Sequence, residues 1–357
     1  MVVKRLMAKD FRCYESLDLE LSKHLNIVYG KNAQGKTNLL EAVYYCATGR
    51  SHRTSFDKEC IRYDQDEAMI KIWYEEKRQD QIEIHLRKNG RKSVAINGYP
   101  AQKINELFGR FHVVVFSPED LSLIKNGPAK RRKFMDMEIC QVDPVYLHNL
   151  QQYYRVLKQR NQLLKDTGKS GKKDETILIW DSQLVHYGVK VMERRAGFTS
   201  RLSELTEEIH AHISGGESLK ITYENAVPMD EMLFQRQLEK AYEKDLRYGT
   251  TSVGPHHDDL ALFIGGADVR MYGSQGQQRT TALSMKLAEF EMMREECGQA
   301  PVLLLDDVMS ELDEERQLHL ARHIEEHQTI LTCTGIEDSL QRLPAGKMFK
   351  VEKGKIV

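Results

Sequence analysis

Hydrophobic and polar residues change their spacing along the chain, and the change marks where strands give way to helices. Residues 68–74 and 81–86 alternate apolar and polar side chains, as half-buried strands do. Asn-Gly pairs that begin at residues 89 and 97 are typical of tight hairpin turns. From residue 128 to about 248 the apolar positions recur at a spacing near 3.6, which predicts helices. We therefore expect an antiparallel meander followed by a helical region.

The longest helical stretch, about residues 176–213, does not keep its apolar residues in a heptad. It therefore predicts a compact helical lobe and not a coiled-coil arm. Beyond residue 248 short apolar strands alternate with helical stretches, which is typical of α/β proteins. These elements are strands at 260–264, 302–305 and 329–332 and helices at 275–296 and 313–326. We expect an α/β head built from residues 1–120 and 249–357, with residues 121–248 inserted as a helical lobe.

Composition and charge narrow the class of protein. Of 357 residues, 41% are hydrophobic and 29% are charged, which excludes a disordered or collagen-like chain. Lys and Arg number 52 and Asp and Glu 53, so the formal net charge is −1 and the chain is not basic as a whole. No apolar run approaches the roughly 18 residues of a membrane span, and no signal-peptide pattern is visible, so we expect a cytoplasmic protein without a membrane partner. The six cysteines form no C-x-x-C pair, so neither zinc nor a disulfide framework is predicted.

Residues 30–37, called the P-loop from here on, match the phosphate-binding pattern G-x-x-x-x-G-K-[ST] in full. An apolar stretch at 25–29 precedes the loop and an amphipathic stretch at 37–46 follows it, giving strand, loop and helix. The glycines let backbone N–H groups curl around a β-phosphate, and the helix N-terminus adds its positive end. Lys36 would reach the β- and γ-phosphates, and the Thr37 hydroxyl would hold Mg²⁺. The predicted nucleotide-binding residues are Gly30, Lys31, Asn32, Ala33, Gln34, Gly35, Lys36 and Thr37.

Two aspartates follow the apolar stretch 302–305, where a nucleotide site needs an acidic partner for its metal. Asp306 would hold Mg²⁺ directly or through a water. Asp307 would point to the other face if the strand continues, and would polarise the attacking water as general base. The alternative is an exposed acidic pair that only ends a strand. Lys36 and Asp307 are thus the catalytic candidates, and Thr37 and Asp306 the metal ligands.

A third motif, Ser274-Gln275-Gly276-Gln277, opens an expected helix about 30 residues before the acidic strand. Alone, S-x-G-Q is a weak signal, but its first N–H groups would form an anion site. The P-loop and the acidic strand are far apart, with 269 residues from Thr37 to Asp306. In that placement the motif looks like the signature motif of ABC-type ATPases, and residues 310–313 occupy the place of their D-loop.

Together these motifs resemble the RecF family of bacterial recombination mediators, whose ATPase head is similar to those of SMC and double-strand-break-repair ATPases. The resemblance runs through almost all of the chain, although only the P-loop would be specific by itself. The other matching strings are Asp10-Phe11-Arg12, residues 38–42, 49–54 and 116–121, Gly127-Pro128, residues 131–134, Arg160-Asn161, Gly254-Pro255-His256 and residues 305–313. The implied fold is α/β, an ABC-ATPase-like head in which a P-loop sheet joins an antiparallel β meander, with an inserted compact helical lobe.

Two positions depart from the family pattern. His257 stands where the Gly-Pro-His-x-Asp-Asp string is expected to carry Arg, which leaves open whether the contacts of that Arg exist here. The neighbouring histidines and aspartates at 256–259 also suggest metal ligation, but adjacent strand positions point to opposite faces. After the strand at 329–332 there is no histidine of the kind with which many ABC ATPases sense the γ-phosphate, so we expect slow turnover.

The resemblance implies an ATP-dependent homodimer. Ser274, Gly276 and Gln277 of one protomer would close on the γ-phosphate held by Lys36 of the other. Arg12 and, by position, Arg50 match an arginine that lies near the nucleotide in related repair ATPases. The alternative for both is a solvated surface arginine. ATP and Mg²⁺ are the implied cofactors, and a weak, DNA-stimulated hydrolysis would act as a conformational switch.

Positive charge is concentrated in the expected helical lobe. Residues 125–133 hold five basic residues and no acidic one, and residues 151–173 hold seven basic residues and one acidic. A charge run is usually only a solvated face, but two such runs in a near-neutral ATPase favour contacts to a DNA backbone. Tyr153 and Tyr154, beside the second run, would pack in the core or stack on bases. The candidate DNA-binding residues are Lys130, Arg131, Arg132, Lys133, Arg155 and Arg160.

Composition and spacing predict a dimerising P-loop ATPase with a basic lobe, and the resemblance implies an ATP-operated DNA clamp of recombinational repair and replication. Binding would follow phosphate contacts and the shape of single-stranded/double-stranded junctions, with little base readout. The single-strand gap, the partners RecR and RecO and the loading of RecA come from the resemblance alone. The alternatives are a non-DNA ABC-type ATPase subunit, such as that of a transporter, a P-loop kinase, and an ATP-binding scaffold without meaningful turnover. A transporter subunit would not need the basic lobe, and a kinase would not need residues 274–279.

Overall fold

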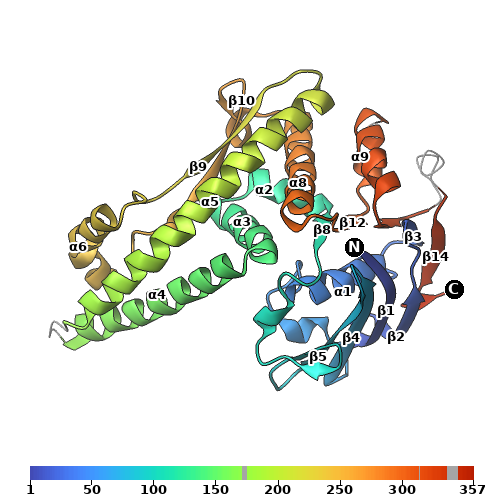
Figure 1. The fold of residues 1–357 in the computed structure, drawn as a ribbon, viewed down its shortest axis with the longest axis horizontal. Coiled ribbons are helices and arrows are strands. Elements are labelled where there is room, and N and C mark those ends of the chain that lie inside the picture. The colour runs from blue at the N-terminus through green and yellow to red at the C-terminus, as the bar shows by residue number, and fades with distance from the viewer. Residues whose placement is uncertain (171–174, 313, 336–344) are drawn as a thin grey trace. The chain divides into compact units, whose positions relative to one another are not determined.

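The structure is a computed structural model that describes residues 1–170, 175–312, 314–335 and 345–357 (Figure 1). The chain forms two compact units, one of Met1–Leu121 with Leu283–Val357 and the other of Ser122–Ala282. The first boundary lies within a residue of the expected one. The second was expected at 248 and lies after Ala282 instead, because a strand at 259–264 pairs with a strand at 219–224 and draws the intervening segment into the helical unit.

An antiparallel sheet forms one part of the first unit, with the strand order β2-β1-β4-β5-β6-β7. Its strands are β1 (Val2–Phe11), β2 (Tyr14–Glu20), β4 (Glu67–Glu75), β5 (Gln79–Arg87), β6 (Ser93–Ile96) and β7 (Tyr99–Pro100). The predicted alternation is confirmed, since β4 buries every second side chain. Asn97 and Gly98 both have positive φ, as the predicted hairpin turn between β6 and β7 requires.

The second sheet of this unit has the order β15-β14-β3-β13-β12-β8. Its strands are β3 (Leu25–Tyr29), β8 (Val113–Phe116), β12 (Val302–Asp306), β13 (Thr329–Cys333), β14 (Lys347–Glu352) and β15 (Lys355–Ile356). From β14 to β8 all neighbours are parallel, so the carboxyl ends of β3, β13 and β12 lie at one edge. In parallel sheets that edge is where ligands bind.

The helix α1 (Lys36–Thr48) packs between the two sheets, where it contacts both β4 and β12 (Figure 1). Nearly all of its side chains are buried, and Leu39, Leu40 and Val43 are fully so. The hydrophobic core of the unit therefore joins side chains from both sheets around this helix. A second helix of the unit, α9 (Glu314–Glu326), separates β12 from β13 in the chain.

The second unit is mainly helical, as predicted. Its elements are α2 (Leu121–Lys125), α3 (Pro128–Val142), α4 (Pro144–Ser170), α5 (Ile177–Ser214), α6 (Glu231–Tyr248), α7 (Val269–Tyr272) and the strands β9 (Leu219–Glu224), β10 (Asp259–Ile264) and β11 (Ala267–Asp268). The two long helices α4 and α5 lie side by side (Figure 1). The helix α8 (Gln275–Cys297) begins in this unit and continues into the first. None of the described helices combines the length and the hydropathy of a membrane span.

Candidate functional site

The P-loop joins the end of β3 to the start of α1, as the sequence predicts. Its backbone has positive φ at Gly30, Ala33 and Gly35. A Cβ at Gly30 would lie 2.4 Å from the Val351 carbonyl oxygen, and a Cβ at Gly35 would lie 2.4 Å from Cys13 Sγ. Both glycines are therefore required by close approach of neighbouring segments as well as by φ.

Lys36 points back into the loop. Its side chain is buried, and Nζ donates hydrogen bonds to the carbonyl oxygens of Gly30 at 2.8 Å and Lys31 at 3.3 Å. An ammonium group held at this place by neutral carbonyls is a compact positive charge suited to a phosphate. Lys31, Asn32 and Ala33, by contrast, are exposed at the rim of the loop.

Gln34 is turned towards the hairpin of β14 and β15. Its side-chain Oε1 accepts a hydrogen bond from the Lys353 backbone N–H at 2.6 Å, and its carbonyl accepts from Gly354 at 3.1 Å. This side chain thus braces the P-loop against the β14–β15 turn. Gln34 is predicted to bind the nucleotide, but its side chain here contacts the protein backbone at Lys353.

The two predicted metal ligands are in direct contact. Thr37 Oγ1 donates to Asp306 Oδ1 at 2.9 Å, across the edge formed by β3, β13 and β12. Thr332, at the end of β13, donates its hydroxyl to the same oxygen at 2.8 Å. Hydroxyl and carboxylate oxygens are ligands that Mg²⁺ accepts, and a Mg²⁺ site usually keeps several waters, so this donor set fits the ion.

Asp307 has left the strand. β12 ends at Asp306, and Asp307 has the left-handed φ of 56°, so the strand does not continue, and the condition for Asp307 to point to the opposite face of the strand is not met. Its backbone N–H donates to Thr332 Oγ1 at 3.0 Å. Thr332 therefore positions both acidic residues, a role that sequence reasoning missed because it looked for a histidine at this strand end.

Arg12 lies against α1 and forms an ion pair. Its Nε and Nη2 donate to the two carboxylate oxygens of Glu41 at 2.9 and 2.5 Å, and Nη1 donates to the Glu59 carbonyl at 2.6 Å. Burial alone would raise the pKa of Glu41, but hydrogen bonds from Arg12 and Ser51 hold it below its usual value. Each guanidinium nitrogen thus has a protein partner, and Arg50 is exposed. A nucleotide contact by Arg12 stays a prediction.

Ser274, Gly276 and Gln277, called the signature segment with Gln275, open α8 in the second unit. Gln277 N–H donates to Ser274 Oγ at 3.2 Å, and Ser274 N–H donates to Gln277 Oε1 at 2.9 Å. This reciprocal pair is a capping box. Ser274 and Gly276 remain exposed at the helix N-terminus, whereas the Gln277 side chain is used by the cap. Of the expected D-loop, Ser310 donates its hydroxyl to the Asp307 carbonyl at 2.9 Å, and Asp313 lies outside the described residues.

The candidate DNA-binding residues divide into two groups. Lys130, Lys133 and Arg155 are exposed, and Arg132 is half-buried with Nη1 donating to the Asp258 carbonyl at 2.6 Å. Arg131 and Arg160 are buried and form ion pairs.

Arg131 binds both carboxylate oxygens of Asp259, at 2.7 and 2.8 Å. Arg160 contacts Asp181 at 2.6 Å and Asp245 at 2.7 Å. The prediction of a DNA contact is therefore wrong for Arg131 and Arg160, because a buried guanidinium already paired with carboxylates cannot reach a phosphate.

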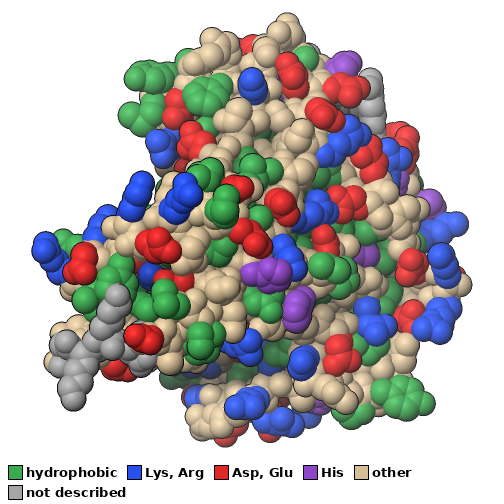
Figure 2. All heavy atoms as spheres, turned by 60° about the vertical axis from the view of Figure 1, so that its left-hand side comes forward, with side chains coloured by type: hydrophobic (Ala, Val, Ile, Leu, Met, Phe, Trp, Pro, Cys, Tyr) green, Lys and Arg blue, Asp and Glu red, His purple; other side chains and the backbone are tan. Residues whose placement is uncertain are grey.

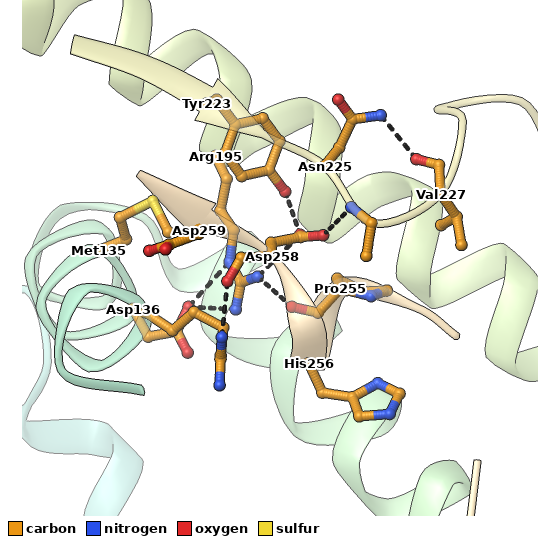
Figure 3. A network of polar contacts seen from close by, with 12 residues as sticks. Met135, Asp136, Arg195, Tyr223, Asn225, Val227, Pro255, His256, Asp258 and Asp259 are labelled. Carbon is orange, nitrogen blue, oxygen red and sulfur yellow. Dashed lines mark hydrogen bonds and ion pairs between the residues drawn. The ribbon is translucent and has the colours of Figure 1, made fainter. Parts of the chain in front are cut away.

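Two of the carboxylates that pair with buried arginines belong to the Gly254–Asp259 string: Asp259 pairs with Arg131, and Asp258 pairs with a third buried arginine, Arg195. Figure 3 shows Arg195 of α5 between Asp136 and Asp258, and its Nη1 also donates to the Pro255 carbonyl at 2.6 Å. Asp258 further accepts hydrogen bonds from the Tyr223 hydroxyl and the Ala226 N–H. Asp258 and Asp259 thus connect α3, α5 and β9 through hydrogen bonds and ion pairs.

The two histidines of the string differ. His256 Nδ1 accepts from the buried Tyr153 hydroxyl at 2.6 Å and Nε2 donates to the Thr251 carbonyl at 3.0 Å, and burial lowers the pKa of His256 to about 4. His257 is exposed. No cluster of three or more metal-ligating side chains occurs within the part of the chain that the structure describes. Tyr153 is a core residue, and Tyr154 is 42% exposed.

Comparison with known proteins agrees with this geometry. Residues 2–352 match the family model "RecF/RecN/SMC N terminal domain". The DNA replication and repair protein RecF of Agathobacter rectalis is 48% identical over 359 residues, which cover 100% of this chain and 99% of the relative. A solved structure of the recombination mediator RecF with ATP, described as part of the RecFOR pathway, is 36% identical with a TM-score of 0.94, covering 100% of this chain and 97% of that one.

An Smc head bound to the C-winged helix domain of ScpA has a TM-score of 0.56 at 18% identity, covering 100% of this chain and 97% of that one, which shows a shared fold. The P-loop joined to Asp306, the signature segment at a helix start and the inserted helical unit all occur in one chain that matches RecF relatives over its full length. The chain belongs to the RecF family, and its ABC-type ATPase head has the fold of SMC heads.

Proposed function

We propose that this chain is an ATP-dependent, dimerising DNA-binding protein of recombinational DNA repair. The observation that carries the proposal is the contact of Thr37 with Asp306 beside a P-loop whose Lys36 points inward. These residues are the two halves of a nucleotide–metal site, brought together from 269 residues apart. The RecF relative solved with ATP, 36% identical, supports ATP as the nucleotide.

The nucleotide would bind to the P-loop in the backbone conformation that the structure shows. Backbone N–H groups at the start of α1 would bind the β-phosphate, and Lys36 would exchange the Gly30 and Lys31 carbonyls for phosphate oxygens. Thr37 and Asp306 would hold Mg²⁺, which supplies neutralisation of the phosphate charge. Thr332 would keep the Asp306 carboxylate in place through its hydroxyl.

Hydrolysis would depend on Asp307 as general base. Its backbone N–H donates to Thr332 Oγ1, and its left-handed φ takes the backbone out of the extended conformation of β12. Turnover is expected to be weak and DNA-stimulated. Because Ser274 and Gly276 are exposed at a helix N-terminus, the signature segment of one protomer would supply N–H groups and a hydroxyl to the γ-phosphate bound by the other. The homodimer would thus form with ATP.

DNA would be bound by the exposed cations of α3 and α4, Lys130, Lys133 and Arg155, with help from Arg132. Figure 2 shows basic side chains interspersed with acidic ones on the face in view. The preferred DNA would be single-stranded/double-stranded junctions at gaps, independent of sequence. RecR and RecO would recognise the ATP-bound state in the cytoplasm, and RecA would be loaded through them.

The test is sedimentation velocity with and without ATP, together with binding to duplex, single-stranded and gapped DNA. The wild type should dimerise only with ATP and should favour gapped DNA. Lys36→Ala should abolish the ATP effect, whereas Lys77→Ala, an exposed change in the turn between β4 and β5, should preserve it. A Lys36→Ala variant that still dimerises with ATP would refute the proposal.

The alternatives of an ATP-binding scaffold and a non-DNA ATPase are separated by two readouts. Asp307→Asn should stop phosphate release and retain the ATP-bound dimer if Asp307 activates water. Unchanged hydrolysis would reject that role, and a wild type without any turnover would favour the scaffold. Dimerisation with ATP but no affinity for any of the three DNAs would favour the non-DNA ATPase.

A further inference from the structure

The Gln277 side chain is held from two sides. Its Oε1 accepts from Ser274 N–H within the capping box, and its Nε2 donates to Glu217 Oε1 at 2.9 Å. The three residues thus form a chain from Glu217 through Gln277 to Ser274. Gln277 is half-buried, and Ser274 and Gly276 are exposed at the helix start.

Glu217 is held in position by contacts with the end of α5. It follows α5, which ends at Ser214 and is capped by Gly215 with a left-handed φ of 71°. The Glu217 N–H donates to Ser214 Oγ at 3.0 Å, and its second carboxylate oxygen lies 3.6 Å from Nε2 of His210, a buried residue of α5. Backbone and side chain of Glu217 are therefore both tied to the last turns of α5.

We propose that Glu217 is a positioning residue for the signature segment. Its carboxylate fixes the amide of Gln277, which fixes the Ser274 backbone, so the Ser274 hydroxyl and the first N–H groups of α8 are presented in one orientation. Without Glu217 the amide of Gln277 gains rotamers, and the capping box competes with other arrangements of the first turn. Preorganised donors bind an anion more tightly than donors that must first be ordered.

The placement also links two parts of the second unit. The carboxyl end of α5, the longest helix of the helical unit, and the start of α8 share one carboxylate. A change in the last turns of α5 therefore alters the signature segment directly. The inference rests on the proposed ATP-dependent dimerisation, in which the signature segment acts on the partner's nucleotide.

The experiment compares Glu217→Ala and Glu217→Gln by sedimentation velocity with ATP. Glu217→Ala should weaken dimerisation by at least about tenfold, because the signature donors at each of the two nucleotide sites must then be ordered when the dimer forms. Glu217→Gln keeps an acceptor for Gln277 Nε2 and should restore most of the affinity. The matched control is Glu207→Ala, whose carboxylate accepts from Ser218 and does not touch the signature segment.

Two readouts separate positioning from a general structural role. ATP affinity of the monomer, measured at protein concentrations far below dimerisation, and the melting temperature should both stay at the wild-type values in Glu217→Ala. The double variant Glu217→Ala with Gln277→Ala should be no weaker than Gln277→Ala alone, because Glu217 acts through Gln277.

Dimerisation of Glu217→Ala equal to wild type would overturn the inference alone. The same holds if monomer ATP affinity or the melting temperature falls in parallel, or if the two substitutions add in full. A wild type that does not dimerise with ATP would overturn the proposed function, and this inference with it.

Discussion

Helix α3 carries two kinds of cation in one short basic run. Arg131 is 2% exposed, and both carboxylate oxygens of Asp259 bind it. Lys130 and Lys133, its neighbours along the chain, are exposed. In α4 the same contrast holds between Arg160, which is fully buried, and Arg155, which is exposed.

The difference shows that a basic run in a sequence mixes structural and surface charges. Arginine suits the buried places because its planar fork satisfies two carboxylate oxygens at once and stays charged. The buried arginines Arg131, Arg160 and Arg195 each pair with aspartates that are distant in the sequence. Only the exposed members of a run count towards the charge that a DNA backbone meets.

The largest effect is expected at the centre of the buried set. Arg195→Met leaves Asp136 and Asp258 without their shared partner, and removing one side of a buried ion pair costs about 3–5 kcal/mol. Urea unfolding followed by circular dichroism measures the loss. Lys130→Met, an exposed control in the same unit, should change the free energy of unfolding by less than about 0.5 kcal/mol. Equal unfolding midpoints for the two variants would show that the buried arginines contribute no more to stability than the exposed cations.

His256 and His257 show the same contrast between a buried and an exposed group, and here it affects how stability depends on pH. The pKa of His256 is lowered to about 4 by burial, with a smaller effect from the nearby His257 and Arg132, so the folded state holds it neutral. As pH falls below 6.5 the unfolded state takes up the proton first. Stability should therefore fall between pH 6.5 and about 4 by up to about 3 kcal/mol, and this contribution should level off below pH 4.

Unfolding curves measured from pH 7 to 4 test this slope. His256→Gln should remove this part of the pH dependence, whereas His257→Gln at the exposed position should retain it. If the pH dependence of stability between pH 6.5 and 4 is unchanged in His256→Gln, it arises from other titratable groups.

Charge reversal of the exposed cations should act on DNA and not on the fold. With Lys130, Lys133 and Arg155 changed to Glu, affinity should fall at least about tenfold for every DNA sequence, and the slope of log affinity against log salt should decrease by about one for each lost contact. Fluorescence anisotropy at several salt concentrations measures both. A control with the same charge change, Lys58, Lys77 and Lys103 to Glu in the first unit, should bind normally. Equal weakening in both triples would reflect net charge alone.

The smallest effect is expected from Arg131→Lys. The positive charge stays, but the two-point contact with Asp259 becomes a single one, which should cost about 1 kcal/mol of stability. DNA affinity should be unchanged, because Arg131 is buried. A clear loss of DNA affinity at unchanged stability would show that Arg131 contacts DNA, as the exposed cations are proposed to do.

Local patterns in the sequence predict the elements closely. The helix expected at 176–213 is Ile177–Ser214, the P-loop lies between strand and helix, and the acidic pair lies at the carboxyl end of β12. Each of these signals depends on neighbours in the chain. The boundary at Ala282 was not predictable in this way, because it depends on the pairing of β9 with β10 about 40 residues away.

The site was predictable in its residue types and less so in its contacts. Thr37 and Asp306 meet as expected. The roles of Thr332, of Glu41 beside Arg12 and of Glu217 beside Gln277 could not be predicted, because each depends on a tertiary contact between segments without a motif of their own. Burial of Arg131 likewise depends on Asp259, 128 residues further along the chain.

The place of β3 in its sheet has a consequence for biosynthesis. The strand that carries the P-loop is made about 300 residues before both of its neighbours in the sheet, β13 and β14. At 5–20 residues per second this interval is roughly 15–60 s. Until then β3 has two unpaired edges, and Gln34 lacks the β14–β15 turn that holds it. A nascent chain therefore acquires its nucleotide site only after β13, β14 and β15 have been made, and a chain released before that point should not compete for ATP.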